Sequence, residues 1–200
     1  MDIDAFILIG GRSSRFGTDK AFVELDGETL ATRAAKTIET ALSPKRVTFV
    51  AASDDQFKGK MPVALHSPII TDLKPGFGAW SGLHAALAYA QNEWTFILAC
   101  DMPFVSAELV KLLAANVDDS YEGIIPRQPD GRLQPLCALY RVKNVLPMIE
   151  EELDAGRSLP PLTDIFDELK TRIVTPDEYA ALDNAGELFR NINTPADLIA

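Results

Sequence analysis

Short, mostly apolar runs recur along the chain, and each ends at a glycine, a proline or a polar residue. The clearest are residues 6–9, 47–50 and 95–100. A continuous apolar run of this length is typical of a strand buried on both faces of a sheet. We therefore predict strands at these places, with shorter extended pieces at 63–65, 69–70, 123–125, 136–140, 172–174 and 188–192.

Between these runs the apolar residues recur at helical spacing. Leu30, Ala34, Ile38 and Leu42 predict an amphipathic helix over about residues 29–42. Ser106 is a favourable first cap for another helix, because its hydroxyl can accept a bond from a free backbone amide. Further helices are predicted at about 80–90, 145–153 and 162–169, with a last helix start at 194–197.

Strands that alternate with helices predict an α/β fold, a three-layer α/β/α arrangement whose central sheet is mainly parallel and partly mixed. No linker or internal repeat divides the chain, so we expect one domain over residues 1–200. In such sheets ligands bind beyond the carboxyl ends of the strands. The segments that follow three strands, at Gly10, Asp72 and Asp101, are therefore expected to meet at one edge.

Composition narrows the class of function. The net charge of −10 argues against a nucleic-acid groove, and no apolar run is long enough to span a membrane. The acidic start of the chain does not resemble a targeting peptide. The two cysteines form no metal or redox motif, which favours reduced thiols and a cytoplasmic protein. Neither of the two histidines lies in a recognisable nucleophile or zinc motif.

A glycine-rich loop with two cations follows the first strand. Gly10, Gly11 and Gly17 permit a close approach of backbone to ligand, and Arg15 and Lys20 add positive charge. A strand that leads into such a loop is typical of a phosphate site. The spacing fits neither the dinucleotide fingerprint nor the Walker A loop. An ordinary surface turn with cations is the alternative.

Two aspartates are the other candidates. Asp101 directly follows an apolar strand, where one carboxylate can share Mg²⁺ with phosphate oxygens and water. Asp72 opens a loop that contains three glycines and one proline. Because aspartate is also common in turns, a purely structural role stays open for both.

Several segments resemble one family, the nucleotidyltransferases related to molybdenum cofactor guanylyltransferase (MobA-like). The first is Leu8-Ile9-Gly10-Gly11-x-Ser13-x-Arg15-Phe16-Gly17-x-Asp19-Lys20, in which the family usually has Ala at position 9 and Met at position 16. The second is the loop from Asp72 to Gly82, in which Ala79-Trp80 replaces the usual Pro-Leu. The third is Ala99-Cys100-Asp101-Met102-Pro103.

Two later segments extend the resemblance. The stretch 126–140 is similar to the part of the family that faces the second substrate, and it carries Gln134-Pro135 where related cytidylyltransferases have His-Pro. Arg190-Asn191-Ile192-Asn193-Thr194-Pro195 is similar to the family's N-x-N-T-P segment. These two segments favour GTP over CTP.

The resemblance implies a Rossmann-like fold and transfer of GMP from GTP to the terminal phosphate of molybdopterin. It implies nucleotide binding by Leu8, Ile9, Gly10, Gly11, Lys20, Asp72 and Asp101, catalysis by Lys20, Arg15 and Asp101, Mg²⁺ on Asp101, and substrate contacts at Gln134, Pro135, Asn191 and Asn193. Other proteins of molybdenum cofactor biosynthesis and acceptor apoenzymes are implied partners. A nucleotidyltransferase that uses CTP or a sugar or alcohol phosphate, and a non-catalytic nucleotide-binding module, are the alternatives.

Overall fold

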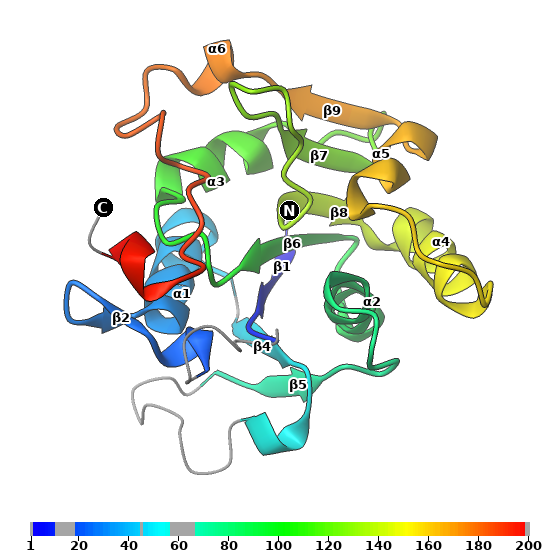
Figure 1. Cartoon of the computed structure of the whole chain (residues 1–200). Coiled ribbons are helices and arrows are strands. Elements are labelled where there is room, and N and C mark those ends of the chain that lie inside the picture. The colour runs from blue at the N-terminus through cyan, green and yellow to red at the C-terminus, as the bar shows by residue number, and fades with distance from the viewer. Residues whose placement is uncertain (1, 11–18, 45, 57–66, 199–200) are drawn as a thin grey trace.

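The structure is a computed structural model, and it describes residues 2–10, 19–44, 46–56 and 67–198. Its centre is a seven-stranded sheet with the order β5-β4-β1-β6-β8-β7-β9 (Figure 1). The strands are β1 Ile3–Leu8, β4 Val47–Ala51, β5 Ile69–Thr71, β6 Trp94–Ala99, β7 Gly123–Pro126, β8 Cys137–Arg141 and β9 Thr171–Val174. The predicted piece at 63–65 lies outside the described residues.

Most strand pairs are parallel, and one strand breaks the pattern. β1 pairs parallel with both β4 and β6, β4 pairs parallel with β5, and β7 with β9. β8 is antiparallel to both of its neighbours, β6 and β7. The prediction of a mainly parallel, partly mixed sheet is confirmed.

Helices cover both faces of the sheet (Figure 1). α1 (Leu30–Leu42) and α3 (Ala107–Ala115) pack together on one face, and α2 (Ala79–Tyr89) and α4 (Val142–Asp154) pack together on the other. Alternate residues of each central strand enter two separate cores, as Ile7 and Leu98 on one face and Phe6 and Ile97 on the other show. This alternation is why strands that read as continuously apolar make a three-layer α/β/α fold.

Short elements complete the described part of the chain. They are the antiparallel pair β2 (Glu24–Leu25) and β3 (Glu28–Thr29), the helices α5 (Ile165–Glu168) and α6 (Pro176–Tyr179), and four 3-10 turns, Lys20–Phe22, Asp54–Gln56, Leu162–Asp164 and Pro195–Leu198. Asp26 and Gly27 both have positive φ, as a tight hairpin turn requires. Ser106 accepts from the amide of Leu109 at 3.2 Å, as its predicted role as helix cap requires. Among the described residues, no helix is both long and apolar enough to cross a membrane.

The extended piece predicted at 188–192 is wrong. The backbone forms turns as far as Phe189 and is irregular after it. The amide of Arg190 donates to the carbonyl of Glu187, as in a turn. The apolar residues there are buried, but Ile192 packs against Leu25 and Leu30 and joins no sheet. Ile192 is therefore apolar because it is buried against the start of α1 and the hairpin of β2 and β3.

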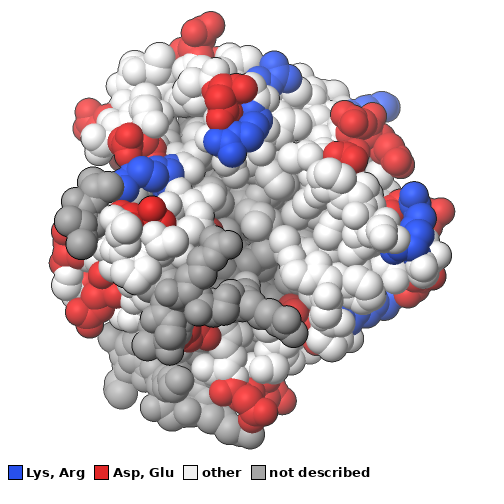
Figure 2. Space-filling model, in the orientation of Figure 1, with Lys and Arg blue, Asp and Glu red and all other residues white. Residues whose placement is uncertain are grey.

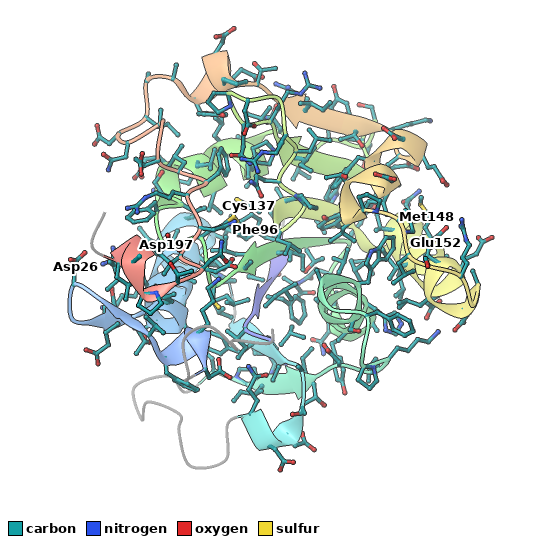
Figure 3. All side chains as sticks on the ribbon, in the orientation of Figure 1. Asp26, Phe96, Cys137, Met148, Glu152 and Asp197 are labelled. Atoms are coloured by element: carbon teal, nitrogen blue, oxygen red, sulfur yellow. The ribbon has the colours of Figure 1, made fainter. Side chains whose placement is uncertain are left out.

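Cys100 and Cys137 are free thiols within the core between the sheet and its α1/α3 layer, and Figure 3 shows Cys137 near Phe96 in the interior. Burial raises the pKa of Cys137 to about 12 and that of Cys100 further, so both stay protonated. We expect the Cys100→Ala/Cys137→Ala double variant to retain the nucleotidyl transfer that the resemblance implies, with a lower melting temperature, because only small apolar groups are removed. Steady-state kinetics and a thermal melt check this, and lost activity in a folded variant would reveal a thiol function.

Candidate active site

A cavity of about 960 Å³ opens at the carboxyl ends of β1 and β4. It is lined by residues that follow β1, β4 and β5 and by the start of α2: Leu8, Gly10, Asp19, Val50, Ala52, Ser53, Asp55, Gln56, Asp72, Gly76, Gly78, Ala79 and Gly82. Three of the predicted nucleotide residues, Leu8, Gly10 and Asp72, are therefore brought to one cavity. Gly11 and Arg15 lie outside the described residues.

The floor of the cavity is fixed by backbone bonds between strands. The amides of Ile9 and Gly10 both donate to the carbonyl of Val50, at 2.9 and 3.1 Å, and the amide of Asp72 donates to the carbonyl of Ala51 at 3.0 Å. In this geometry the amides of Ile9 and Gly10 are engaged with β4 and do not face outward as free phosphate donors.

The loop 72–78 forms one wall, and it is held from several sides. Gly76 and Gly78 have φ of 105° and 61°, conformations that favour glycine. The hydroxyl of Ser81 donates to the carbonyl of Lys74 at 2.6 Å and accepts from the amide of Phe77 at 3.0 Å. Lys74 also pairs with Asp154 of α4 at 2.5 Å. Gly78 and Ala79, at the start of α2, line the cavity, so the positive end of the helix dipole lies at the cavity.

A second polar group lies next to this cavity. Lys20 Nζ donates to Asp101 Oδ2 and to Asn193 Oδ1, both at 2.8 Å. These three residues are far apart in sequence, and all three are predicted site residues that the structure brings together. Asp101 follows Cys100, whose amide donates to the carbonyl of the cavity residue Leu8 at 3.1 Å.

Local structure explains how each member is positioned. Asp19 Oδ1 accepts from the amide of Ala21 at 3.1 Å and so caps the 3-10 turn that begins with Lys20. The amide of Ile192 donates to the carbonyl of Asp101 at 2.9 Å, which brings the C-terminal segment to the end of β6. Asp197 Oδ2 accepts from the amide of Asn193 at 2.7 Å and fixes the turn that carries the Asn193 side chain.

The remaining predicted substrate residues, Gln134, Pro135 and Asn191, lie outside the cavity lining. The backbone of Gln134 bonds to Pro126 and to Cys137, and the carbonyl of Pro135 accepts from Tyr140 Oη at 2.5 Å. Gln134 and Pro135 are partly buried, Asn191 is exposed, and none of them lines the cavity. Their proposed contact with a second substrate stays a prediction.

Asp101 supplies one carboxylate to a hard cation, and the remaining ligands must come from elsewhere. The described residues contain no group of three or more His, Cys, Asp or Glu side chains that could together hold a metal ion. Asp101 offers a partly exposed carboxylate at a strand end, and one carboxylate with phosphate and water oxygens is a common Mg²⁺ arrangement. Asp101 therefore fits a divalent cation that arrives with a phosphate ligand.

Asp72 carries an altered acidity. Burial raises the pKa of its carboxyl to about 6, from an ordinary value of 3.8. Because the folded state binds this proton more tightly than the unfolded chain, the group lowers stability as pH rises from about 4 to 6. We expect Asp72→Asn to raise the melting temperature of the nucleotide-free protein above pH 6 and to leave it nearly unchanged below pH 4. Thermal melts across this range test the claim, and an equal difference at every pH contradicts it.

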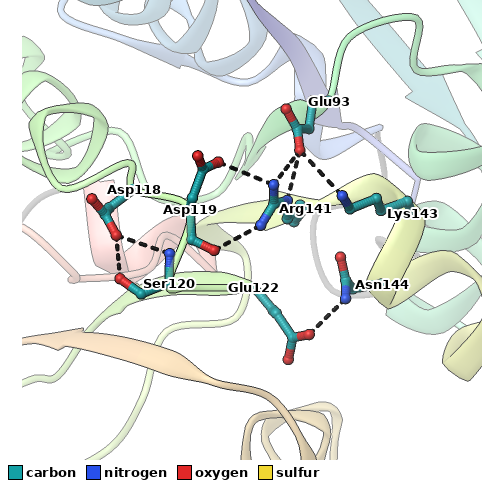
Figure 4. Close-up of polar contacts among 8 residues, drawn as sticks. All are labelled: Glu93, Asp118, Asp119, Ser120, Glu122, Arg141, Lys143 and Asn144. Carbon is teal, nitrogen blue, oxygen red and sulfur yellow. Dashed lines mark hydrogen bonds and ion pairs between the residues drawn. The ribbon is translucent and has the colours of Figure 1, made fainter.

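The largest described network of charges lies elsewhere. Arg141, at the end of β8, pairs with Glu93 at 2.5 Å and with Asp119 at 3.1 Å, and Glu122 accepts from Asn144 at 2.6 Å (Figure 4). Glu93 precedes β6 at its amino end, on the edge opposite Asp101. These charges satisfy one another, which indicates a structural role. On the face shown in Figure 2, Lys and Arg likewise lie in separate small groups, mostly beside Asp or Glu.

Sequence reasoning missed two residues of the cavity. Asp55 and Gln56 lie on the 3-10 turn Asp54–Gln56, which follows β4. No motif marks them, because their position depends on where the turn packs after β4. Asp19, a cavity residue, was quoted within the glycine-rich motif but given no role.

Comparison with known proteins agrees with this architecture. Residues 5–169 match the family described as MobA-like NTP transferase domain. A protein named molybdenum cofactor guanylyltransferase, from Desulfosudis oleivorans, is 32% identical over 197 residues, which cover 98% of this chain and 92% of that protein. The crystal structure of molybdopterin-guanine dinucleotide biosynthesis protein A from Archaeoglobus fulgidus aligns with a TM-score of 0.76 and 26% identity, covering 98% of this chain and 95% of that one.

A more distant structure shows how widely the fold is shared. The 2-C-methyl-D-erythritol 4-phosphate cytidylyltransferase from Thermus thermophilus aligns over 100% of this chain and 96% of its own, with a TM-score of 0.69 and 15% identity. At that identity the likeness concerns the fold alone. The nearer matches cover almost the whole chain, and the chain therefore belongs to the MobA-like NTP transferase family, the nucleotidyltransferases that include molybdenum cofactor guanylyltransferase.

Proposed function

We propose that this enzyme transfers GMP from GTP to the terminal phosphate of molybdopterin, with or without bound molybdenum. A phosphate oxygen of molybdopterin attacks the α-phosphorus of GTP, the bond to the β-phosphate breaks, and pyrophosphate leaves. The products are molybdopterin guanine dinucleotide and pyrophosphate. The near full-length identity to a protein of this name is the observation that carries the proposal.

The cavity and the neighbouring group of Lys20, Asp101 and Asn193 suit different parts of GTP. The cavity is lined by three carboxylates, Asp19, Asp55 and Asp72, and by no Lys or Arg among its described residues. Carboxylates repel phosphates but accept hydrogen bonds from the amino group of a base and from ribose hydroxyls. We assign the cavity to the nucleoside and the Lys20 side to the triphosphate, with Arg15 as a second cation.

The reaction needs alignment and charge neutralisation more than proton removal. A phosphate monoester is already ionised at neutral pH, so the nucleophile requires no base. Lys20 is positioned to neutralise charge that develops on the phosphates, and Asn193 orients the ammonium group through its side-chain oxygen. A divalent cation held by Asp101, for which Mg²⁺ is the candidate, supplies further charge neutralisation when it is bound.

Molybdopterin, the acceptor of GMP, is assigned to the part of the site that neither the cavity nor Lys20 occupies. Gln134 and Pro135, just before the start of β8, and Asn191, near the C-terminal turn, are proposed to contact molybdopterin. The whole chain, residues 1–200, is proposed to act as one nucleotidyltransferase domain. Transfer of the product to acceptor apoenzymes, contact with other cofactor-biosynthesis proteins and a cytoplasmic location stay predictions.

One experiment tests the assignment directly. The protein is incubated with molybdopterin, Mg²⁺ and each of the four nucleoside triphosphates in turn, and pyrophosphate release is measured. We expect release with GTP that depends on molybdopterin. Faster release with CTP would keep the enzyme class and refute the guanylyl assignment. Nucleotide binding without any release would favour a non-catalytic module.

A further inference from the structure

The side chain of Gln56 joins two loops at the cavity. Its Nε2 donates to the carbonyl of Ile9 at 2.8 Å, and its Oε1 accepts from the amide of Ala52 at 2.9 Å. Ile9 directly follows β1, and Ala52 directly follows β4. Both ends of the amide are therefore occupied by backbone groups just beyond the last rungs of the parallel ladder.

These two loops approach each other very closely at this point. A Cβ atom on Gly10 would lie 2.8 Å from the amide nitrogen of Ala52, closer than real side chains come. Such contact leaves little tolerance in the relative position of the loops. The Gln56 amide satisfies one carbonyl and one amide across the junction, and it also lines the cavity.

We propose that Gln56 is a positioning residue that sets the shape of the nucleoside half of the GTP site. It does so by fixing the Ile9–Gly10 backbone against Ala52, so that the cavity wall is formed before the nucleotide arrives. The inference rests on the proposed function, because it requires that the nucleoside binds in this cavity. It assigns Gln56 no contact with the reacting phosphates.

The argument predicts a selective effect. A wall that is already in place lowers the ordering cost of binding, and this benefit is the same before and during the chemical step. Loss of such uniform binding raises KM while kcat is unchanged. A residue that only stabilised the fold would lower the melting temperature and leave the KM of the folded enzyme unaltered.

The test uses Gln56→Met, which keeps the unbranched shape and removes both hydrogen bonds without adding charge. Gln91→Met is the matched control, because Gln91 is exposed at the amino end of β6, far from the cavity. We expect Gln56→Met to raise KM for GTP roughly tenfold, with kcat within about twofold and KM for molybdopterin unchanged. Inhibition by GMP should weaken by a similar factor, while inhibition by inorganic tripolyphosphate should not change.

Other outcomes overturn the inference. An unchanged KM for GTP in a folded Gln56→Met protein refutes it, and so does a fall in kcat at constant KM. If Gln56→Met does not fold, Gln56→Glu takes its place. Its carboxylate still accepts from the amide of Ala52, but it cannot donate to the carbonyl of Ile9 and repels that oxygen. An unchanged KM for GTP in that variant also refutes it, and so does weaker tripolyphosphate inhibition, which would show charge repulsion. If wild type releases no pyrophosphate with GTP, the proposed function fails instead, which is a separate result.

Discussion

Lys20→Ala is expected to lower kcat/KM for GTP. The expected loss of transition-state stabilisation is about 2–4 kcal/mol, the range typical of a lost preorganised charge. Lys20 Nζ lies 2.8 Å from both Asp101 and Asn193, so the ammonium group is held in place by two side chains. An alanine leaves no group there to neutralise the phosphates. Steady-state rates of pyrophosphate release measure the loss.

Folding should survive this substitution. The side chains of Lys20 and Asp101 are 16% and 28% exposed, and a partly exposed ion pair contributes little to stability. Lys111→Ala is the matched control, because Lys111 is an exposed lysine of α3. Near-normal activity of a folded Lys20→Ala protein would remove Lys20 from the catalytic assignment.

The apolar pattern predicted the fold well because burial on both faces is a strong constraint. β1, β4 and β6 were recognised from runs that admit almost no polar residue, and the expectation that the segments after Gly10, Asp72 and Asp101 would meet at one edge follows from parallel pairing alone. The strand predicted at 188–192 was wrong because burial alone, without a strand, also requires apolar residues. Burial of Ile192 requires an apolar residue, and the pattern does not reveal whether a strand or a turn provides the burial.

The site was predictable only where a motif marks it. Lys20, Asp101 and Asn193 stand in separate segments of the sequence, and the structure adds that one ammonium group joins them. Gln56 carries no motif, because its function depends on a junction between two loops that only folding creates. The resemblance implies nucleotide binding by Ile9 and Gly10, but the sequence does not tell whether a neighbouring carbonyl, here that of Val50, already accepts from their amides.

Asp101→Asn is expected to abolish the joint stabilisation by Mg²⁺ and GTP. One carboxylate leaves most of the metal's coordination to water or phosphate, so Asp101 alone should hold Mg²⁺ weakly. In the structure its Oδ2 is paired with Lys20. Arrival of the metal with the triphosphate would give Asp101 a new partner and let Lys20 turn to the phosphates. Each ligand should therefore tighten the other, reciprocally.

A thermal melt measures this coupling. A ligand at about a hundred times its Kd adds roughly 2.7 kcal/mol to the stability of the native state. For a chain of this size that corresponds to a rise of about 5–10 °C. We expect this rise with GTP and Mg²⁺ together and a smaller one with either alone. Asp167→Asn, an exposed aspartate on α5, is the matched control and should behave as wild type.

The variant separates the metal site from the fold. Asparagine keeps an oxygen that can accept from Lys20, and the ion pair is partly exposed, so the melting temperature without ligands should change little. The neutral amide is a poor ligand for a divalent cation, so the extra rise with GTP and Mg²⁺ should disappear while the GTP-only rise remains. A full metal-dependent rise in Asp101→Asn would place the cation on other groups. A larger rise with CTP than with GTP in wild type would keep the enzyme class and refute the choice of guanine nucleotide.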